Sequence, residues 1–282
     1  MVSIIVINYN DKVRIKRAIN SALNQSYSNK EIIVVDDGSD KATRKIYNDF
    51  PGVKLIQLER TDKTARTPSR ARNAGAKEAK GEFIYFLDSD NYIESSFIED
   101  LRKCNKDVAY CNWEIVGKQT YKVDIEKVWD KGTSIIENYL KHTHLDHQCI
   151  LIKRSYFDKV GHYDTRLPRS QDCDLLVRLM LGDGEWEHVE KKLFTFEKHE
   201  EDQMKTVASI HGKTLWTLKN NINYTWLIGM CSQSPYYLAS FLKGVKDFTE
   251  SKEWKEEYDK SQFKEFLISH NEILTGERSE VA

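Results

Sequence analysis

The chain has 282 residues, of which 40% are hydrophobic and 31% are charged, a balance typical of a folded globular protein with a sizeable core. Its 43 basic and 44 acidic residues give a net charge of −1, which argues against a nucleic-acid binder because such proteins carry a basic excess. The five cysteines form no CxxC pair, and no apolar run reaches the roughly 18 residues that a membrane span needs. A cytoplasmic protein is expected.

The first hundred residues alternate between apolar runs and amphipathic segments. Residues 2–7 (VSIIVI) and 31–35 (EIIVV) are runs rich in β-branched side chains, typical of strands buried on both faces. Between them, residues 15–23 carry apolar side chains at helical spacing. A short helix over residues 42–48 and a strand over residues 53–58 are predicted next.

A further helix begins near Thr67 and Pro68, because proline suits the first helical position. Its small residues, among them Gly75, would let it lie close to a sheet, and residues 82–87 form the fourth predicted strand. This alternation predicts a parallel, doubly wound sheet. In such sheets ligands bind outside the carboxyl ends of the strands, where the polar clusters of this sequence lie.

Beyond residue 100 the pattern is mixed. Strands are predicted over residues 108–113, 149–153 and 193–197, and a helix that opens on acids over residues 170–181. From residue 203 onward the chain is predicted to be mainly helical, with several aromatic patches.

The sequence FLDSDN places Asp88 and Asp90 directly after the fourth predicted strand. Carboxylate oxygens suit Mg²⁺ or Mn²⁺, which commonly keep substrate phosphate oxygens among their ligands. One carboxylate could bind a metal and the other a sugar or ribose hydroxyl. A polar turn is the plain alternative, since Asp, Ser and Asn all favour turns.

A second acidic cluster, Asp36-Asp37-Gly38-Ser39, follows the second predicted strand. A carboxylate here could accept a hydrogen bond from a base N–H or a ribose hydroxyl, and the alternative is a helix cap. The segment that follows the third strand carries four arginines, at positions 60, 66, 70 and 72. Arginine suits bidentate contact with phosphate, although a solvated helix face is expected for at least two of the four. Arg66 and Arg72 are the predicted ligand contacts.

Four motifs now stand in one order over residues 2–181: VSIIVINYN, VVDDGSD, RARNAGAKEAKGEFIYFLDSDN and SQDCDLLVRLM. This ordered set resembles the family 2 nucleotide-sugar glycosyltransferases with the GT-A fold. FEKHEED, at residues 196–202, is similar to the family's late segment, in which a histidine follows a strand. The resemblance implies a GT-A catalytic domain over residues 1–202, built on a doubly wound, Rossmann-like, mostly parallel sheet. Residues 203–282 would form a mainly helical C-terminal appendage.

The resemblance also implies a donor site with a divided set of tasks. The uracil or equivalent base would be held by Ile7, Tyr9 and Asp37. The base or diphosphate would be approached by Arg72 and Arg66, and the ribose or sugar by Asp88 and Ser89. Mn²⁺ or Mg²⁺ bridging the diphosphate would be bound by Asp90 and approached by His199. The alternative for His199 is pairing with its acidic neighbours on a polar loop.

Asp172 is the catalytic base that the resemblance implies. Family members often carry Glu-Asp at this helix start, and here Gln171 replaces the first acid. Asp174 would face elsewhere on the helix, as a supporting or capping residue. The alternative for Asp172 is an acid that stabilises the helix dipole. The implied reaction is a single in-line displacement that inverts the anomeric configuration and needs no nucleophilic side chain.

The expected function is transfer of a sugar, most simply from a UDP-sugar, to an acceptor hydroxyl in surface glycan or polysaccharide synthesis. The acceptor would be a glycan or a lipid-linked molecule, with no role for nucleic acid. One alternative is a non-catalytic nucleotide-sugar binding protein. It is disfavoured because a scaffold needs none of the four acids Asp37, Asp88, Asp90 and Asp172. Another is a sugar-phosphate nucleotidyltransferase, disfavoured because VSIIVINYNDK lacks the glycines of the required loop. Residues 203–282 would bind the acceptor, form a homo-oligomer or rest peripherally on the inner face of a membrane. For residues 224–245 within this region, the plainer alternative is a helix pair packed on the catalytic domain.

Overall fold

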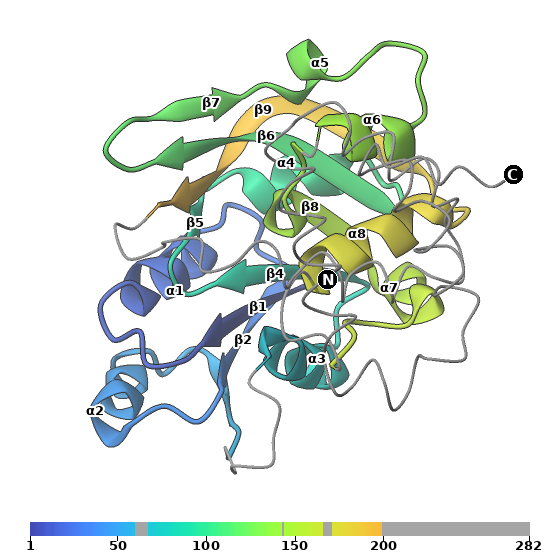
Figure 1. The fold of residues 1–282 in the computed structure, drawn as a ribbon. Coiled ribbons are helices and arrows are strands. Elements are labelled where there is room, and N and C mark those ends of the chain that lie inside the picture. The colour runs from blue at the N-terminus through green and yellow to red at the C-terminus, as the bar shows by residue number, and fades with distance from the viewer. Residues whose placement is uncertain (60–66, 143, 166–170, 199–282) are drawn as a thin grey trace, which may run out of the picture. The chain divides into compact units, whose positions relative to one another are not determined.

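The computed structural model describes residues 1–59, 67–142, 144–165 and 171–198 (Figure 1). In this part of the chain nine strands form one sheet, ordered β3-β2-β1-β4-β8-β6-β9-β5, with β7 paired to β6. The strands are β1 (Val2–Asn8), β2 (Lys30–Asp36), β3 (Lys54–Gln57), β4 (Phe83–Asp88), β5 (Tyr92–Ile93), β6 (Val108–Val116), β7 (Tyr121–Val123), β8 (Ile150–Lys153) and β9 (Trp186–Glu197).

The helices of the same residues are α1 (Ile15–Leu23), α2 (Lys41–Arg44), α3 (Pro68–Glu78), α4 (Phe97–Lys103), α5 (Ile125–Val128), α6 (Ile135–His142), α7 (Arg154–Val160) and α8 (Gln171–Leu181). Two 3₁₀ turns complete the set, η1 (Lys45–Asp49) and η2 (His147–Cys149). Within the described residues, no helix combines the length and the apolar character that crossing a bilayer requires. The appendage expected over residues 203–282, and its boundary, lie outside the described residues and stay predictions.

The first four strands are parallel, as the alternation of strands and helices predicts. β1 pairs in parallel with β2 on one side and with β4 on the other, and β3 pairs in parallel with the outer side of β2. All seven residues of β1 are buried, which its run of β-branched side chains explains. In register, Asn8 lies beside Asp36 and Ile7 beside Asp88. The polar clusters after β1, β2 and β4 therefore meet at one edge of the sheet.

The second half of the sheet changes direction. β8 runs antiparallel to both β4 and β6, and β6 runs parallel to β9 (Figure 1). Because β8 opposes β4, the start of β8 lies at the edge where β4 ends. The turn η2, which immediately precedes β8, is thereby brought to the polar edge. β9 begins at Trp186 rather than at residue 193, because its polar first half pairs with β6 while remaining only partly buried.

Helix α3 lies directly on β1 and β2. A Cβ added at Gly75 would stand 2.4 Å from Cγ2 of Ile5 and 3.1 Å from Cγ2 of Val35. Pro68 occupies the first turn, where its missing N–H is not needed, as the sequence predicts. This close packing fixes the height and rotation of α3, and so the directions of its arginines, Arg70 and the buried Arg72.

A substitution at Gly81, just before β4, tests how tightly the chain packs at the opposite end of these strands, where β4 begins. A Cβ at Gly81 would lie 2.5 Å from the backbone N of Ser3 and 2.7 Å from the backbone O of Phe83. Gly81→Ala should lower the free energy of unfolding by about 2–3 kcal/mol, because backbone atoms cannot move aside. Denaturant unfolding checks this, with Gly52→Ala as the control, since a Cβ at Gly52 would meet nothing within 4 Å. Equal unfolding midpoints for the two variants would contradict the expectation.

Candidate active site

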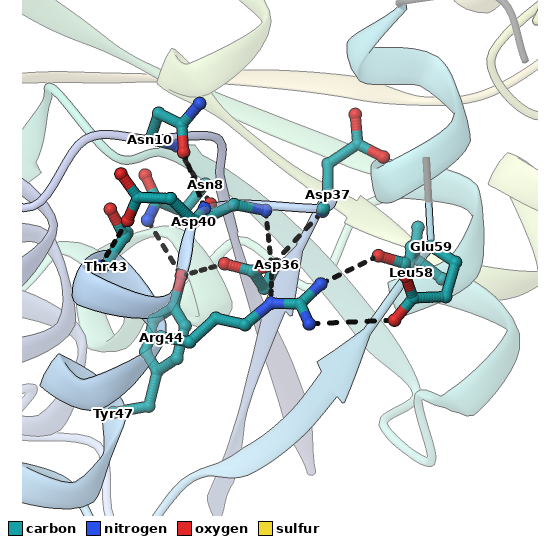
Figure 2. Close-up of polar contacts among 12 residues, drawn as sticks. Asn8, Asn10, Asp36, Asp37, Asp40, Thr43, Arg44, Tyr47, Leu58 and Glu59 are labelled. Carbon is teal, nitrogen blue, oxygen red and sulfur yellow. Dashed lines mark hydrogen bonds and ion pairs between the residues drawn. The ribbon is translucent and has the colours of Figure 1, made fainter. Parts of the chain in front are cut away.

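The two adjacent aspartates at the end of β2 have different tasks. Asp36 is fully buried, and its carboxylate accepts hydrogen bonds from the backbone N of Ser39 (2.9 Å) and from the hydroxyl of Tyr47 (2.7 Å). The Tyr47 hydroxyl accepts in turn from Nδ2 of Asn8 (2.8 Å), and burial raises the pKa of Tyr47. Figure 2 shows this network, with the Asp37 carboxylate pointing away from it. Asp36 therefore holds the strand ends together and leaves Asp37 to face a ligand.

Asp37 is held by an arginine of α3. Nε and Nη2 of Arg70 donate to Oδ1 of Asp37 at 3.2 and 3.0 Å, and the Asp37 side chain is only 7% exposed. Arg70 also donates to the backbone O of Glu59 (2.9 Å). The arginine that contacts the predicted base-binding acid is thus Arg70, which the sequence did not single out.

Arg72, two residues later, pairs with the acid at the end of β4. Its Nη2 donates to both carboxylate oxygens of Asp88, at 2.8 and 2.9 Å, and its guanidinium lies 5.1 Å from the ring centroid of Tyr163. Burial opposes the charge on Arg72, whose side chain is 4% exposed, but Asp88 and Tyr163 more than compensate and raise its pKa. Burial likewise opposes the charge on Asp88, but Arg72 and His147 lower its pKa below the ordinary value. Both groups therefore remain ionised.

Two nitrogens of Arg72, Nε and Nη1, are buried without a hydrogen-bond partner among the described residues. Buried donors of this kind are normally satisfied, so these two mark a place for a ligand or water oxygen. The neighbouring Asn73 ties α3 to Tyr163: its Nδ2 donates to the backbone O of Tyr163 (2.8 Å), and its Oδ1 accepts from the backbone N of Tyr163 (3.1 Å).

Gln148 of η2 supports the Asp88–Asp90 turn from below. Its Oε1 accepts from the backbone N of Asp88 (2.8 Å) and from Nδ2 of Asn91 (3.2 Å), and its Nε2 donates to Oδ2 of Asp88 (3.3 Å). The Gln148 side chain is buried, so water does not compete for these bonds. One glutamine thus fixes both the backbone and the carboxylate of the strand end.

The outer side of the same turn is tied to α1 and β9. Arg17 donates to the backbone O of Asp90 (3.0 Å) and pairs with Glu197, and its guanidinium lies 4.4 Å from the ring centroid of Tyr92. The backbone N of Glu197 donates to Oδ1 of Asn91 (3.0 Å). Two segments distant in sequence, α1 and β9, therefore fix the backbone that presents Asp90.

Asp172 lies in the first turn of α8, where the helix dipole favours a negative charge. Its side chain is 40% exposed, and its Oδ2 lies 4.0 Å from Nδ1 of His147. Asp174 is fully buried and pairs with Arg178 one turn later (2.6 Å), so its role is structural. Because Gln148 contacts Asp88, the adjacent His147 places Asp172 at the same edge of the sheet.

Of the remaining predicted site residues, Ile7 is nearly buried in β1, between Val35 and Asp88 in register. Tyr9 lies just past the strand end and is 46% exposed, and Ser89 is half-buried in the turn. The structure therefore brings together every described member of the predicted site: Ile7, Tyr9, Asp37, Arg72, Asp88, Ser89, Asp90 and Asp172. Arg66 and His199 lie outside the described residues.

The metal-binding capacity of the site rests on the acids of one turn. In the described part of the chain, no three His, Cys, Asp or Glu side chains converge as metal ligands. Asp88 is engaged by Arg72, and Asp90 stands two residues later in the same turn. A hard oxygen donor of this kind fits Mg²⁺ or Mn²⁺, which are commonly bound by one or two carboxylates together with substrate phosphates and water.

The sequence missed three contributors besides Arg70: His147, Gln148 and Tyr163. His147 and Gln148 precede β8, so nothing in a parallel-strand interpretation places them at the site. Their one signal is a polar His-Gln pair set directly before an apolar strand.

A model of Glycosyl transferase family 2 matches residues 3–161 of the chain, which include both acidic strand ends and η2. The chain belongs to this family. An uncharacterized glycosyltransferase of Haemophilus influenzae is 34% identical to this family 2 glycosyltransferase over 174 residues, covering 58% of the chain and 68% of the relative. The Escherichia coli UDP-Glc:alpha-D-GlcNAc-diphosphoundecaprenol beta-1,3-glucosyltransferase WfgD is 37% identical over 125 residues, covering 43% of the chain and 48% of WfgD. Across the first four curated relatives, the chain spans 55–68% of their length.

Solved structures confirm the GT-A fold of this family 2 glycosyltransferase. Residues 1–349 of Staphylococcus aureus TarS, in complex with UDP-GlcNAc, align with a TM-score of 0.65 at 19% identity, over 90% of this chain and 77% of that chain. The mannosyltransferase PcManGT of Pyrobaculum calidifontis, in complex with GDP-Man and Mn²⁺, aligns with a TM-score of 0.57 at 14% identity, over 98% of this chain and 81% of that chain.

Proposed function

We propose that this family 2 glycosyltransferase transfers a sugar from a nucleotide-sugar donor, most simply a UDP-sugar, to an acceptor hydroxyl with inversion at the anomeric carbon. The observation that carries the proposal is the meeting of Asp37, Asp88, Asp90 and Asp172 at one edge of the sheet. The complex of TarS with UDP-GlcNAc and the UDP-Glc in the name of WfgD support the choice of donor.

In the proposed donor complex, Asp37 accepts hydrogen bonds from the base and is oriented by Arg70. Asp88, oriented by Arg72 and Gln148, accepts from hydroxyls of the ribose or sugar, and Ile7, Tyr9 and Ser89 complete the contacts. The unpartnered nitrogens of Arg72 are available to an oxygen of the diphosphate. Arg66 and His199 remain proposed contacts to the diphosphate and metal.

Asp172 is the proposed general base. It takes the proton of the acceptor hydroxyl as the acceptor oxygen forms a bond with the anomeric carbon. On the opposite face the bond between that carbon and the diphosphate oxygen breaks, and its electron pair leaves with the nucleoside diphosphate. The half-exposed position of Asp172 suits this role, because the acceptor must reach it from solvent.

Asp90, with Asp88 nearby, is the proposed holder of Mn²⁺ or Mg²⁺. When bound, the cation neutralises negative charge on the leaving nucleoside diphosphate. The Mn²⁺ in the PcManGT complex supports the choice of ion. The residues of this chain supply the carboxylate oxygen and, through Arg17 and Asn91, keep the turn in place.

A donor panel tests the proposal. Nucleoside diphosphate release should occur with at least one UDP-sugar in the presence of Mn²⁺, and removing the metal with EDTA should lower the rate about a hundredfold. Re-adding Mn²⁺ or Mg²⁺ should restore it. Asp90→Ala should lose the metal response, whereas Asp183→Ala, at an exposed ion pair with Lys159, should keep it.

Three results would contradict this proposal in different ways. Absence of release or transfer with every donor would remove the enzymatic function. Donor binding by calorimetry without turnover would favour a nucleotide-sugar binding protein. Full activity in EDTA would remove the metal from the proposal and leave the transfer.

The acceptor is proposed to be a glycan or a lipid-linked molecule of surface glycan synthesis, on the support of the diphosphoundecaprenol acceptor in the name of WfgD. A cytoplasmic enzyme working at the inner face of the membrane fits such an acceptor. Residues 203–282 are proposed to contact the acceptor, the membrane surface or a second copy of the chain. Flotation of the full chain with anionic vesicles, beside its oligomeric state by light scattering, separates these roles.

A further inference from the structure

His147 is a buried polar side chain at the site that no proposed donor contact uses. Its side chain is 4% exposed, and neither ring nitrogen has a hydrogen-bond partner among the described residues. Buried imidazole nitrogens are normally satisfied, so this ring is placed for a partner that is not yet in contact. Its Nδ1 lies 3.4 Å from Oδ1 of Asp146 and 4.0 Å from Oδ2 of Asp172.

The ring of His147 is held in place on several sides. Asp146 caps η2, since its side chain accepts from the backbone N of Gln148 (2.8 Å) and its backbone O from that of Cys149 (3.0 Å). Tyr163 packs edge-on against the imidazole, with the ring centroids 6.1 Å apart. Gln148, the next residue, is fixed to Asp88. The imidazole therefore has little freedom to move.

Of the two acids beside Nδ1, Asp172 is the one whose side chain can rotate toward the ring. Asp146 is committed to its cap, and burial raises its pKa while His147 opposes that rise. Asp172 is 40% exposed at a helix start, and a rotation of its side chain that closes the gap by about 1 Å reaches hydrogen-bond distance.

We propose that His147 is a positioning residue for Asp172. Nδ1–H of His147 donates to one carboxylate oxygen of Asp172, and this bond turns the other oxygen toward the acceptor hydroxyl. The inference rests on the proposed function, because it takes Asp172 as the base. The acceptor proton passes to the free oxygen of Asp172, and His147 keeps its own proton throughout. The donated bond stabilises the ionised carboxylate, as hydrogen bonds to a charged form do. The other titratable or charged groups around this pair are Tyr139 on α6, Cys173 on α8, Tyr163 after α7, Asp88 on β4 and Arg72 on α3.

Two substitutions at His147 separate a positioning role from a packing role. His147→Phe keeps a ring of similar size without nitrogen, and it should lower kcat about tenfold or more while donor KM and donor affinity stay within about twofold. His147→Asn, whose Nδ2 can stand near the position of Nδ1, should recover most of kcat. His162→Asn, at a half-exposed histidine beside Asp158, should change neither kcat nor donor KM.

The Asp172→Asn background decides whether His147 acts through Asp172. Adding His147→Phe there should cause no further loss of kcat. Three results would each overturn the inference. The first is an undiminished kcat in His147→Phe, and the second is that His147→Phe lowers kcat as much in the Asp172→Asn background as in the unaltered enzyme. The third is a His147→Asn variant that folds stably but is as inactive as His147→Phe. If Asp172→Asn alone keeps full activity, the proposed base fails and this inference fails with it. If Asp172→Asn is impaired and His147→Phe is not, only this inference fails.

Discussion

Asp172→Asn should lower kcat for sugar transfer by about a thousandfold, because the amide cannot accept the acceptor proton. Donor affinity should change little, since Asp172 lies on α8 beside His147, whereas Asp37 and Asp88, the proposed donor contacts, lie at the ends of β2 and β4. Steady-state rates at saturating donor, beside calorimetric donor binding, measure the two effects separately. The change is nearly isosteric and the side chain is 40% exposed, so the fold should tolerate it.

Asp183→Asn is the matched control for that experiment. Asp183 is exposed just after α8 and pairs with Lys159 at the surface. The kcat of the Asp183→Asn variant should therefore equal that of the unaltered enzyme. A small effect of Asp172→Asn, within about threefold, would show that the base is another group and that the helix-dipole interpretation of Asp172 is right.

Arg72→Met should both destabilise the protein and weaken donor binding. The Arg72 side chain is 4% exposed and that of Asp88 is 28% exposed, so the variant leaves a partly buried carboxylate without its main partner. We expect a loss of about 3 kcal/mol in the free energy of unfolding, near the lower end for broken buried pairs because Asp88 keeps some water and Gln148. Donor affinity should fall as Asp88 loses its orientation.

The destabilisation by Arg72→Met should depend on pH in a defined direction. The folded-state pKa of Asp88 lies below its ordinary value of 3.8, so the ion pair stabilises the fold at pH values above that ordinary value. This contribution is lost as pH falls through the lowered folded-state pKa. The difference in unfolding free energy between the two proteins should therefore be constant near neutrality and shrink below about pH 4.

Arg102→Met is the control for that series. Arg102 pairs with the exposed Glu82 at 3.4 Å, and exposed pairs contribute about 0–1 kcal/mol. Denaturant unfolding of both variants between pH 3 and pH 7 makes the comparison. A loss no larger for Arg72→Met than for Arg102→Met, at every pH, would mean that the Arg72–Asp88 pair is not the strong interaction that its burial indicates.

The sequence predicted the parallel half of the sheet because local signals are strong there. Apolar runs rich in β-branched or aromatic residues specify β1, β2 and β4, and short connections leave right-handed crossover as the favoured route. Once those strands are parallel, their carboxyl ends must meet, so Asp37 and Asp88 could be brought together by pattern alone. The register of Asn8 with Asp36 and of Ile7 with Asp88 confirms this.

The arginines show where sequence reasoning stops. Arg70 and Arg72 stand two apart in one helix and have similar local surroundings in the sequence. The close contact of Gly75 with Ile5 sets the rotation of α3, which directs Arg70 to Asp37 and Arg72 to Asp88. Only packing could assign each arginine to its acid.

The sequence by itself determined the fold class, the family and the strand-end acids, since these depend on residue periodicity and on short ordered motifs. The tertiary structure alone decided that Asp36 is structural, that Gln148 holds Asp88 and that His147 stands beside Asp172. The reason is the direction of β8. Because β8 runs antiparallel to β4, the start of β8 lies where β4 ends, and this brings Gln148 to Asp88, some 60 residues away in sequence. Long-range strand pairing of this kind leaves no periodic trace in the sequence.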